Sequence, residues 1–201
     1  MFIVFEGIPK CGKTTQITRL IEWLKDNTRV KLYKTKEPQD PELARLIQEA
    51  KATPIRELDL RMQDRKEHFK YILKPMLDCG FWVFSDGFTL RDVAHFGYGD
   101  GLDIPRINRL SESATEGLKP DLTIVLDCCI ENAIDRGIEF EHNRIYLEKI
   151  RMGYLEVARK KGYTIVNGNL HEDAVFNRIK DTVIQFLPEE DREFIGVKLF
   201  V

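Results

Sequence analysis

The residues best suited to chemistry lie in one run near the start of the chain, Gly7-Ile8-Pro9-Lys10-Cys11-Gly12-Lys13-Thr14. Its glycines let the backbone curl until successive N–H groups point inward at phosphate oxygens, and a following helix adds partial positive charge. Lys13 is expected to reach the β- and γ-phosphates of ATP, and Thr14 to ligate Mg²⁺. This run, together with Thr15, is therefore predicted to bind ATP.

A second acidic group is expected beside this loop, at the end of a neighbouring strand. In phosphoryl transfer such a carboxylate orients Mg²⁺ or accepts a proton from the acceptor. Asp86 and Asp127 each follow an apolar run, at residues 81–84 and 122–126. Either aspartate can instead cap the turn after its strand. By the logic of its role we favour Asp86, as a catalytic residue and as a metal ligand with Thr14, and Asp127 more weakly.

Apolar runs predict the strands that must position these groups, at residues 2–5, 30–33, 81–84, 122–126 and 163–166. Predicted helices separate these strands. In the first, residues 13–26, apolar residues recur at i, i+3, i+4 and i+7, as on one face of a helix. Further helices are predicted near residues 43–47, 55–79, 105–116, 130–136, 146–160 and 171–186, with Pro75 loosening the end of one and a glycine-rich loop at 97–101.

This alternation predicts an α/β fold, with a parallel sheet and helices on both of its faces. We expect one domain over residues 1–187 and a C-terminal tail at 188–201 whose role the sequence does not show.

The composition excludes several classes of protein. The balance of 31 basic and 33 acidic residues provides no overall field that would attract nucleic acid or a membrane surface. No apolar run approaches the roughly 20 residues of a membrane span, and none resembles a signal peptide. The four cysteines have no metal-ligand spacing, and the vicinal pair among them is poorly suited to a disulfide. We expect a cytoplasmic protein with no membrane partner.

Motifs elsewhere narrow the choice among kinases, GTPases and other ATPases. No Asn-Lys-x-Asp guanine-reading motif occurs. Over residues 1–187 the chain resembles thymidylate kinases, through Phe5-Glu6-Gly7, Lys13-Thr14-Thr15-Gln16, Lys36-Glu37-Pro38, Gly97-Tyr98-Gly99, Lys119-Pro120-Asp121 and Phe140-Glu141. The resemblance implies a three-layer P-loop kinase fold with strand order 2-3-1-4-5, ATP as donor, Mg²⁺, a short lid near residues 136–144 and often a homodimer.

The acceptor half departs from the family pattern. Pro9 stands where the family has an Asp that meets the sugar hydroxyl, and Gly87 where it has an Arg that holds the acceptor phosphate. Arg61 replaces the aromatic residue that stacks on thymine, and Phe96 replaces a Gln. From the resemblance we expect acceptor contacts from Glu37, Arg61, Arg65, Arg91 and Phe96, with Arg91 compensating for Gly87.

The cation that stabilises the transferring phosphoryl group also differs. In many family members lid arginines do this work, and here the lid offers only Arg136. In another branch of the family a basic residue inside the P-loop does it, and Lys10 occupies that position. Such a cation accelerates transfer by several powers of ten. The predicted catalytic residues are therefore Lys10, Lys13, Asp86 and Arg136.

Three functions remain open. The first is transfer of the γ-phosphoryl group of ATP to a small nucleotide, dTMP or a related pyrimidine deoxynucleotide. The second is a kinase of a hydroxyl acceptor, such as hydroxymethyluracil in a nucleotide or in the modified DNA of a phage, with Asp86 as general base; binding to DNA would fall steeply with salt. The third is a nucleotide-binding partner protein that has lost catalysis, although the intact Lys13, Thr14 and Asp86 argue against it.

Overall fold

A computed structural model of the chain describes residues 1–138 and 144–198. Five parallel strands form its sheet, in the order β2-β3-β1-β4-β5. The strands are β1 (Phe2–Glu6), β2 (Leu32–Lys36), β3 (Trp82–Asp86), β4 (Leu122–Asp127) and β5 (Thr164–Asn167). The predicted fold class and strand order are confirmed.

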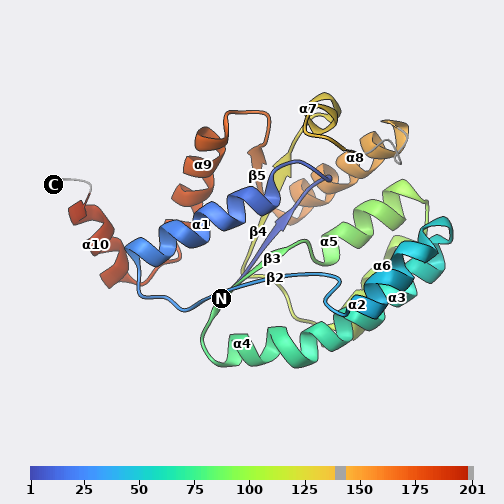
Figure 1. Ribbon diagram of the computed structural model, residues 1–201, viewed down its shortest axis with the longest axis horizontal. Helices are drawn as coiled ribbons and strands as arrows, with labels where there is room; N and C mark the ends of the chain where they lie inside the picture. The colour runs from blue at the N-terminus through green and yellow to red at the C-terminus, as the bar shows by residue number, and fades with distance from the viewer. Residues whose placement is uncertain (139–143, 199–201) are drawn as a thin grey trace.

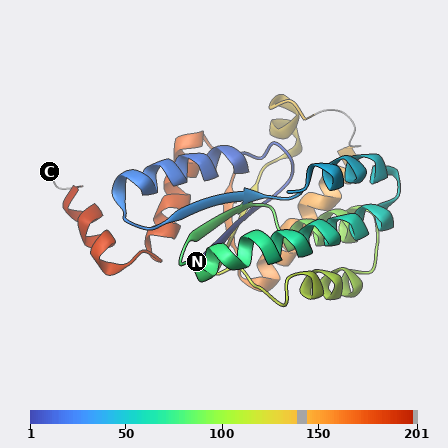
Figure 2. The same ribbon diagram turned by 60° about the horizontal axis from the view of Figure 1, so that its bottom comes forward.

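Helices cover both faces of this sheet. Their bounds are α1 (Lys13–Asn27), α2 (Pro41–Glu49), α3 (Pro54–His68), α4 (Lys74–Asp78), α5 (Thr89–Asp92), α6 (Ile104–Ala114), α7 (Ile130–Asp135), α8 (Arg144–Lys161), α9 (Glu172–Ile184) and α10 (Glu189–Lys198). Three short helical stretches join them, the 3₁₀ turn η1 (Ala50–Ala52) and the π-helical η2 (Phe69–Leu73) and η3 (Val93–Gly99). Helices α1 and α9 lie on one face, whereas α3, α4, α6 and α8 lie on the other (Figures 1 and 2).

The central strand β1 supplies both halves of the core, because neighbouring residues of a strand face opposite ways. Ile3 and Phe5 pack with the apolar stripe of α1, which includes Ile17 and Leu20. Phe2 and Val4 instead pack with apolar residues of η2 and β3, Phe69, Leu73 and Val83. A strand buried on both faces reads as a continuous apolar run, which is why residues 2–5 were recognisable.

The helix predicted over residues 55–79 occurs as α3, η2 and α4 in succession. Pro75 lies in the first turn of α4, directly after the π-helical stretch Phe69–Leu73. Proline has no N–H to donate to the carbonyl four residues earlier, and this missing hydrogen bond accounts for the wide π-helical turn before it.

The prediction of a glycine-rich loop at residues 97–101 was wrong over Gly97–Gly99, which belong to η3. These glycines allow close packing. A Cβ at Gly97 would lie 2.6 Å from Ile104 Cγ1, and one at Gly99 would lie 2.6 Å from Tyr146 Cε2. The helical stretch η3 therefore approaches α6 and α8 more closely than a larger side chain would permit.

The second strand is displaced from its predicted position at residues 30–33, and the C-terminal tail, for which no element was predicted, is helical. The second strand begins at Leu32 and continues through Lys34 and Lys36, which are exposed on the edge strand of the sheet. The C-terminal tail forms helix α10 beside the C-terminal end of α1 (Figure 1), where the Asp191 carboxylate accepts a hydrogen bond from the Arg29 N–H at 3.3 Å.

Residues 139–143, which include Phe140, Glu141 and most of the expected lid, lie outside the described residues. Within residues 1–138 and 144–198, the helices are all too short or too polar to cross a membrane.

Candidate active site

The loop between β1 and α1 adopts a phosphate-cradling conformation. Gly7 and Gly12 have φ values of 134° and 103°, and Lys10 has a φ of 61°. Gly7 is also required by space, because a Cβ there would lie 2.5 Å from the Leu126 carbonyl oxygen. Helix α1 starts at Lys13, so its N-terminal N–H groups and partial positive charge face the loop.

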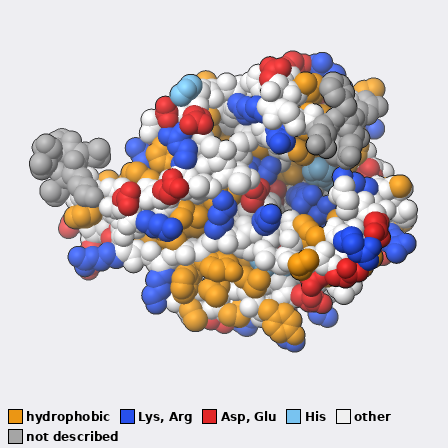
Figure 3. Space-filling view, viewed as in Figure 1, with side chains coloured by type: hydrophobic (Ala, Val, Ile, Leu, Met, Phe, Trp, Pro, Cys, Tyr) orange, Lys and Arg blue, Asp and Glu red, His pale blue; other side chains and the backbone are white. Residues whose placement is uncertain are grey.

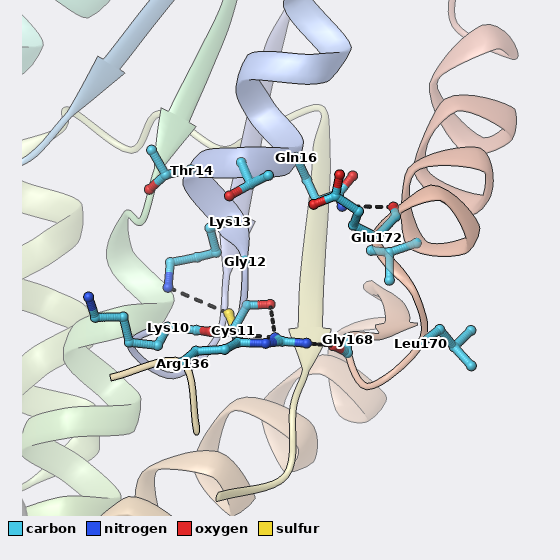
Figure 4. A pocket seen from close by; sticks show the side chains of 12 residues that line it. Lys10, Cys11, Gly12, Lys13, Thr14, Gln16, Arg136, Gly168, Leu170 and Glu172 are labelled. Atoms are coloured by element: carbon cyan, nitrogen blue, oxygen red, sulfur yellow. Dashed lines mark hydrogen bonds between the residues drawn. The ribbon is translucent and has the colours of Figure 1, made fainter. Parts of the chain in front are cut away.

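Two lysines present cations at this loop. The Lys13 amine donates to the carbonyls of Gly7 at 2.9 Å and Ile8 at 3.0 Å, and it lies 3.7 Å from the Cys11 sulfur. Lys10 is exposed. Figure 4 shows both amines on the same side of the loop. A phosphate held there would therefore meet two positive charges.

A cavity of about 520 Å³ extends from the loop toward α9. Its lining combines loop residues, the start of α1 and the segment after β5, namely Lys10, Cys11, Gly12, Lys13, Thr14, Thr15, Gln16, Arg136, Gly168, Leu170, Glu172 and Val175. The Gln16 amide donates to the Glu172 carbonyl at 3.0 Å and closes one wall (Figure 4). The cavity offers a cationic, glycine-lined end and a less polar end near Leu170 and Val175, as a nucleoside triphosphate requires.

Arg136 is tied to the wall of this cavity by backbone carbonyls. Its guanidinium donates to the oxygens of Gly168 at 3.0 Å and Cys11 at 3.4 Å (Figure 4). It also lies 3.5 Å from the Cys128 sulfur. These contacts bridge the P-loop and the segment after β5. They do not fit the expected role of a lid arginine that reaches the transferring phosphoryl group.

The candidate metal ligands meet at the junction of β3 and α1. The Thr14 hydroxyl donates a hydrogen bond to the Asp86 carboxylate, so the two predicted ligands lie side by side. A hydroxyl and a carboxylate are hard oxygen ligands of the kind that Mg²⁺ takes together with phosphate oxygens and water. Asp127, the weaker candidate, is engaged elsewhere, because its Oδ1 accepts from Arg151 Nε at 2.7 Å.

A second cavity, of about 710 Å³, lies on the other side of the P-loop. It is lined by residues of five parts of the chain: Pro9, Glu37, Pro38, Ala44, Ile47, Gln48, Lys51, Glu57, Arg61, Arg91, His95, Phe96, Asp100 and Tyr146. Figure 3 shows Lys and Arg side chains gathered with a histidine in a hollow on this face. Four of the expected acceptor residues, Glu37, Arg61, Arg91 and Phe96, therefore line one cavity.

Arg65, the fifth expected acceptor residue, lies beneath this cavity and does not line it. Its side chain is 1% exposed and forms ion pairs with Glu37 at 2.7 Å and with Asp92. Burial alone would raise the pKa of Glu37, but Arg65 and His68 outweigh it and lower the pKa to about 2. Arg65 therefore holds Glu37 ionised at the cavity edge, and the expectation that it contacts the acceptor does not fit its position.

Arg61 is paired within its own helix. Its Nε and Nη2 donate to Glu57 Oε1 at 2.8 and 2.7 Å, and both side chains are largely buried. The i, i+4 spacing on α3 could have revealed this pair from the sequence. Glu57, His95, Asp100 and Tyr146 were missed because the sequence does not show which side chains face one cavity, even for His95 and Asp100 beside Gly97-Tyr98-Gly99.

Glu6 is fully buried behind the P-loop. Its Oε1 accepts from the Phe88 N–H at 2.9 Å, whereas Oε2 has no hydrogen-bond partner within the described part of the chain. Burial raises the pKa of Glu6 to about 7, against the opposing effects of Phe88 and Lys13. The carboxyl group is thus half protonated near neutral pH.

This shift makes stability depend on pH with a definite sign. The unfolded carboxyl loses its proton near its ordinary pKa of 4.5 and the native one near 7, so the native state binds more protons between them. The free energy of unfolding should fall by up to about 3 kcal/mol as pH rises through this range. Glu6→Gln, neutral throughout, should exceed the wild type in stability at pH ~8 and match it near pH ~4.5.

Urea unfolding of both proteins across this range tests the prediction, with Glu112→Gln on the exposed face of α6 as control. Parallel pH profiles for wild type and Glu6→Gln would show that Glu6 does not titrate as described.

Comparison with known proteins gives one consistent family. A family model described as Thymidylate kinase matches residues 5–179. The thymidylate kinase of Synechococcus sp. (strain CC9605) is 36% identical over 193 residues, covering 87% of this chain and 92% of that protein. That of Prochlorococcus marinus (strain NATL2A) is 34% identical over 200 residues, covering 90% and 95%. That of Synechococcus sp. (strain WH7803) is 35% identical over 197 residues, covering 89% and 92%.

Proposed function

Since this chain belongs to the thymidylate kinase family and is a P-loop kinase, we propose that it transfers the γ-phosphoryl group of ATP to dTMP or a closely related pyrimidine deoxynucleotide. One observation carries the proposal. Adjacent residues of the same loop line the two cavities, Lys10 the first and Pro9 the second. A donor and an acceptor bound in these cavities would meet at the P-loop, beside Thr14 and Asp86.

The first cavity is the proposed site for ATP, the phosphoryl donor. The loop N–H groups and the start of α1 bind the phosphates, and Lys13 moves from the Gly7 and Ile8 carbonyls to the phosphate oxygens. Thr14 and Asp86 would hold Mg²⁺, which when bound neutralises charge on the donor phosphates. Lys10, exposed next to Lys13, stabilises the charge that develops on the transferring group.

The transfer itself needs little covalent help from the protein. An oxygen of the acceptor phosphate attacks the γ-phosphorus, the bond from that phosphorus to the β–γ bridging oxygen breaks, and ADP leaves with the bonding electron pair. A phosphate monoester is mostly a dianion above its second pKa of about 6, so no general base is required. The lysines and the loop therefore act by position and charge.

Because its contacts join the P-loop to the segment after β5, Arg136 fixes the wall of the proposed ATP site. Arg136→Ala should raise KM for ATP about 10- to 100-fold, the effect of losing charge-assisted hydrogen bonds, and change kcat less than about threefold. Steady-state kinetics against Arg159→Ala, an exposed arginine of α8, measures the split. A fall in kcat that exceeds the rise in KM would instead support the catalytic role expected from the sequence.

A panel of acceptors tests the proposed function. ADP release is measured with ATP and Mg²⁺ in the presence of dTMP, dUMP, 5-hydroxymethyl-dUMP, dCMP, dAMP, thymidine or hydroxymethyluracil-containing DNA. We expect turnover with dTMP or another pyrimidine monophosphate. Turnover confined to the DNA would favour a hydroxyl acceptor, and turnover with none of the panel would leave the proposed function without support.

A further inference from the structure

The segment after β3 holds one arginine, Arg91, in a fixed place at the second cavity. Before it, the Phe88 N–H donates to Glu6 Oε1 at 2.9 Å. After it, Asp92 is fully buried and forms an ion pair with Arg65. Because the backbone is anchored on both sides, the Arg91 side chain starts from a rigid base and reaches the cavity that it lines.

The side chain of Arg91 lies over Gly87. A Cβ added at Gly87 would lie 3.7 Å from Arg91 Cδ, which is ordinary van der Waals contact. Gly87 directly follows Asp86, the last residue of β3. The arginine stem thus lies against position 87, next to the candidate metal ligand.

Arg91 differs from the neighbouring arginines in its contacts. Arg61 pairs with Glu57, and Arg65 behind the cavity pairs with both Glu37 and Asp92. Among residues 1–138 and 144–198, no ion pair or hydrogen bond of the Arg91 side chain is found. The pKa of Arg61 is lowered by burial and then by Arg91, so the two guanidinium groups lie close together. Arg91 therefore offers the cavity a guanidinium group whose hydrogen-bond donors are available to an anion.

We propose that Arg91, whose stem lies against Gly87, binds the phosphate of the acceptor in the second cavity. A guanidinium fork can donate two parallel hydrogen bonds to a phosphate, which fixes both its position and its orientation. The inference rests on the proposed function and narrows it: the acceptor carries a phosphate monoester, which Arg91 holds beside Asp86.

Binding of dTMP and of thymidine tests the inference, because the two differ only in the phosphate. Isothermal titration calorimetry measures both Kd values for the wild type, Arg91→Ala, Arg91→Gln and the control Arg178→Ala, which alters an exposed arginine of α9. In the two Arg91 variants we expect Kd for dTMP to rise about 10- to 100-fold and Kd for thymidine to change less than about twofold. Arg178→Ala should change neither.

Equal weakening of both ligands in Arg91→Gln, which keeps most of the stem, would show that Arg91 only supports the fold and would overturn the inference. Unchanged Kd values for both ligands would overturn it as well. Failure of the proposed function gives a different result. If the wild type phosphorylates no monophosphate, the proposed function is wrong. If wild type and Arg91→Ala phosphorylate dTMP equally well, only the role of Arg91 is wrong.

Discussion

Lys13→Ala should lower kcat/KM for ATP-dependent phosphorylation by about 10³-fold or more, the largest effect of any single substitution, because it removes a cation at the transferring phosphate. The structure gives the physical reason. The amine is held by the carbonyls of Gly7 and Ile8, at the mouth of the loop whose glycines have positive φ. Lys13 is the first residue of α1, so its side chain starts at the end of the helix that faces the loop.

Steady-state kinetics of Lys13→Ala is compared with Lys25→Ala, which removes an exposed lysine of the same helix. The control should keep wild-type kcat and KM, and both proteins should have wild-type thermal unfolding midpoints. If Lys13→Ala retained more than about a tenth of the activity, the P-loop would not be the site of phosphoryl transfer.

Asp86→Asn should lower kcat by about 10²- to 10³-fold and shift the Mg²⁺ concentration for half-maximal rate upward, since it removes the charge that orients the metal. The substitution keeps the shape of the side chain and its hydrogen bond with Thr14. What it changes is the negative charge at the end of β3, one residue from Gly87.

A Mg²⁺ titration of kcat for Asp86→Asn and for Asp59→Asn, an exposed aspartate of α3, separates this effect from general loss of charge. An unchanged Mg²⁺ dependence with a rate that rises with pH would contradict the metal role. It would point to Asp86 as a general base, as a hydroxyl acceptor requires.

The strands buried on both faces were the most predictable elements of the fold. The strands β1 and β4 are almost fully buried, and their continuous apolar runs predicted them within one residue. The edge strand β2 was displaced in the prediction, because Lys34 and Lys36 are exposed and polar residues on an edge weaken the strand signal. Gly97 and Gly99 were misread because glycine at a close helix contact has the same sequence signature as glycine in a loop.

The P-loop part of the first cavity was predictable because its residues are contiguous. Gly7 to Thr15 form one motif whose geometry is local, whereas Asp86 and the cavity wall after β5 come from other elements. The second cavity combines residues of α2, α3, α5, η3 and α8, so no spacing in the sequence connects Glu57 with Asp100 or Tyr146. The burial of Arg65 could not be predicted either, because its position on a helix does not show that it pairs with Glu37 and Asp92.

The fate of the labelled γ-phosphoryl group distinguishes phosphorylation of dTMP from hydrolysis of ATP. The wild-type protein is incubated with [γ-³²P]ATP, Mg²⁺ and dTMP, and the products are separated by thin-layer chromatography. Labelled dTDP should form in amounts equal to ADP, and none should form with Lys13→Ala. Label that remains in ATP, or that appears only as inorganic phosphate while dTMP is unchanged, would contradict phosphorylation of this acceptor.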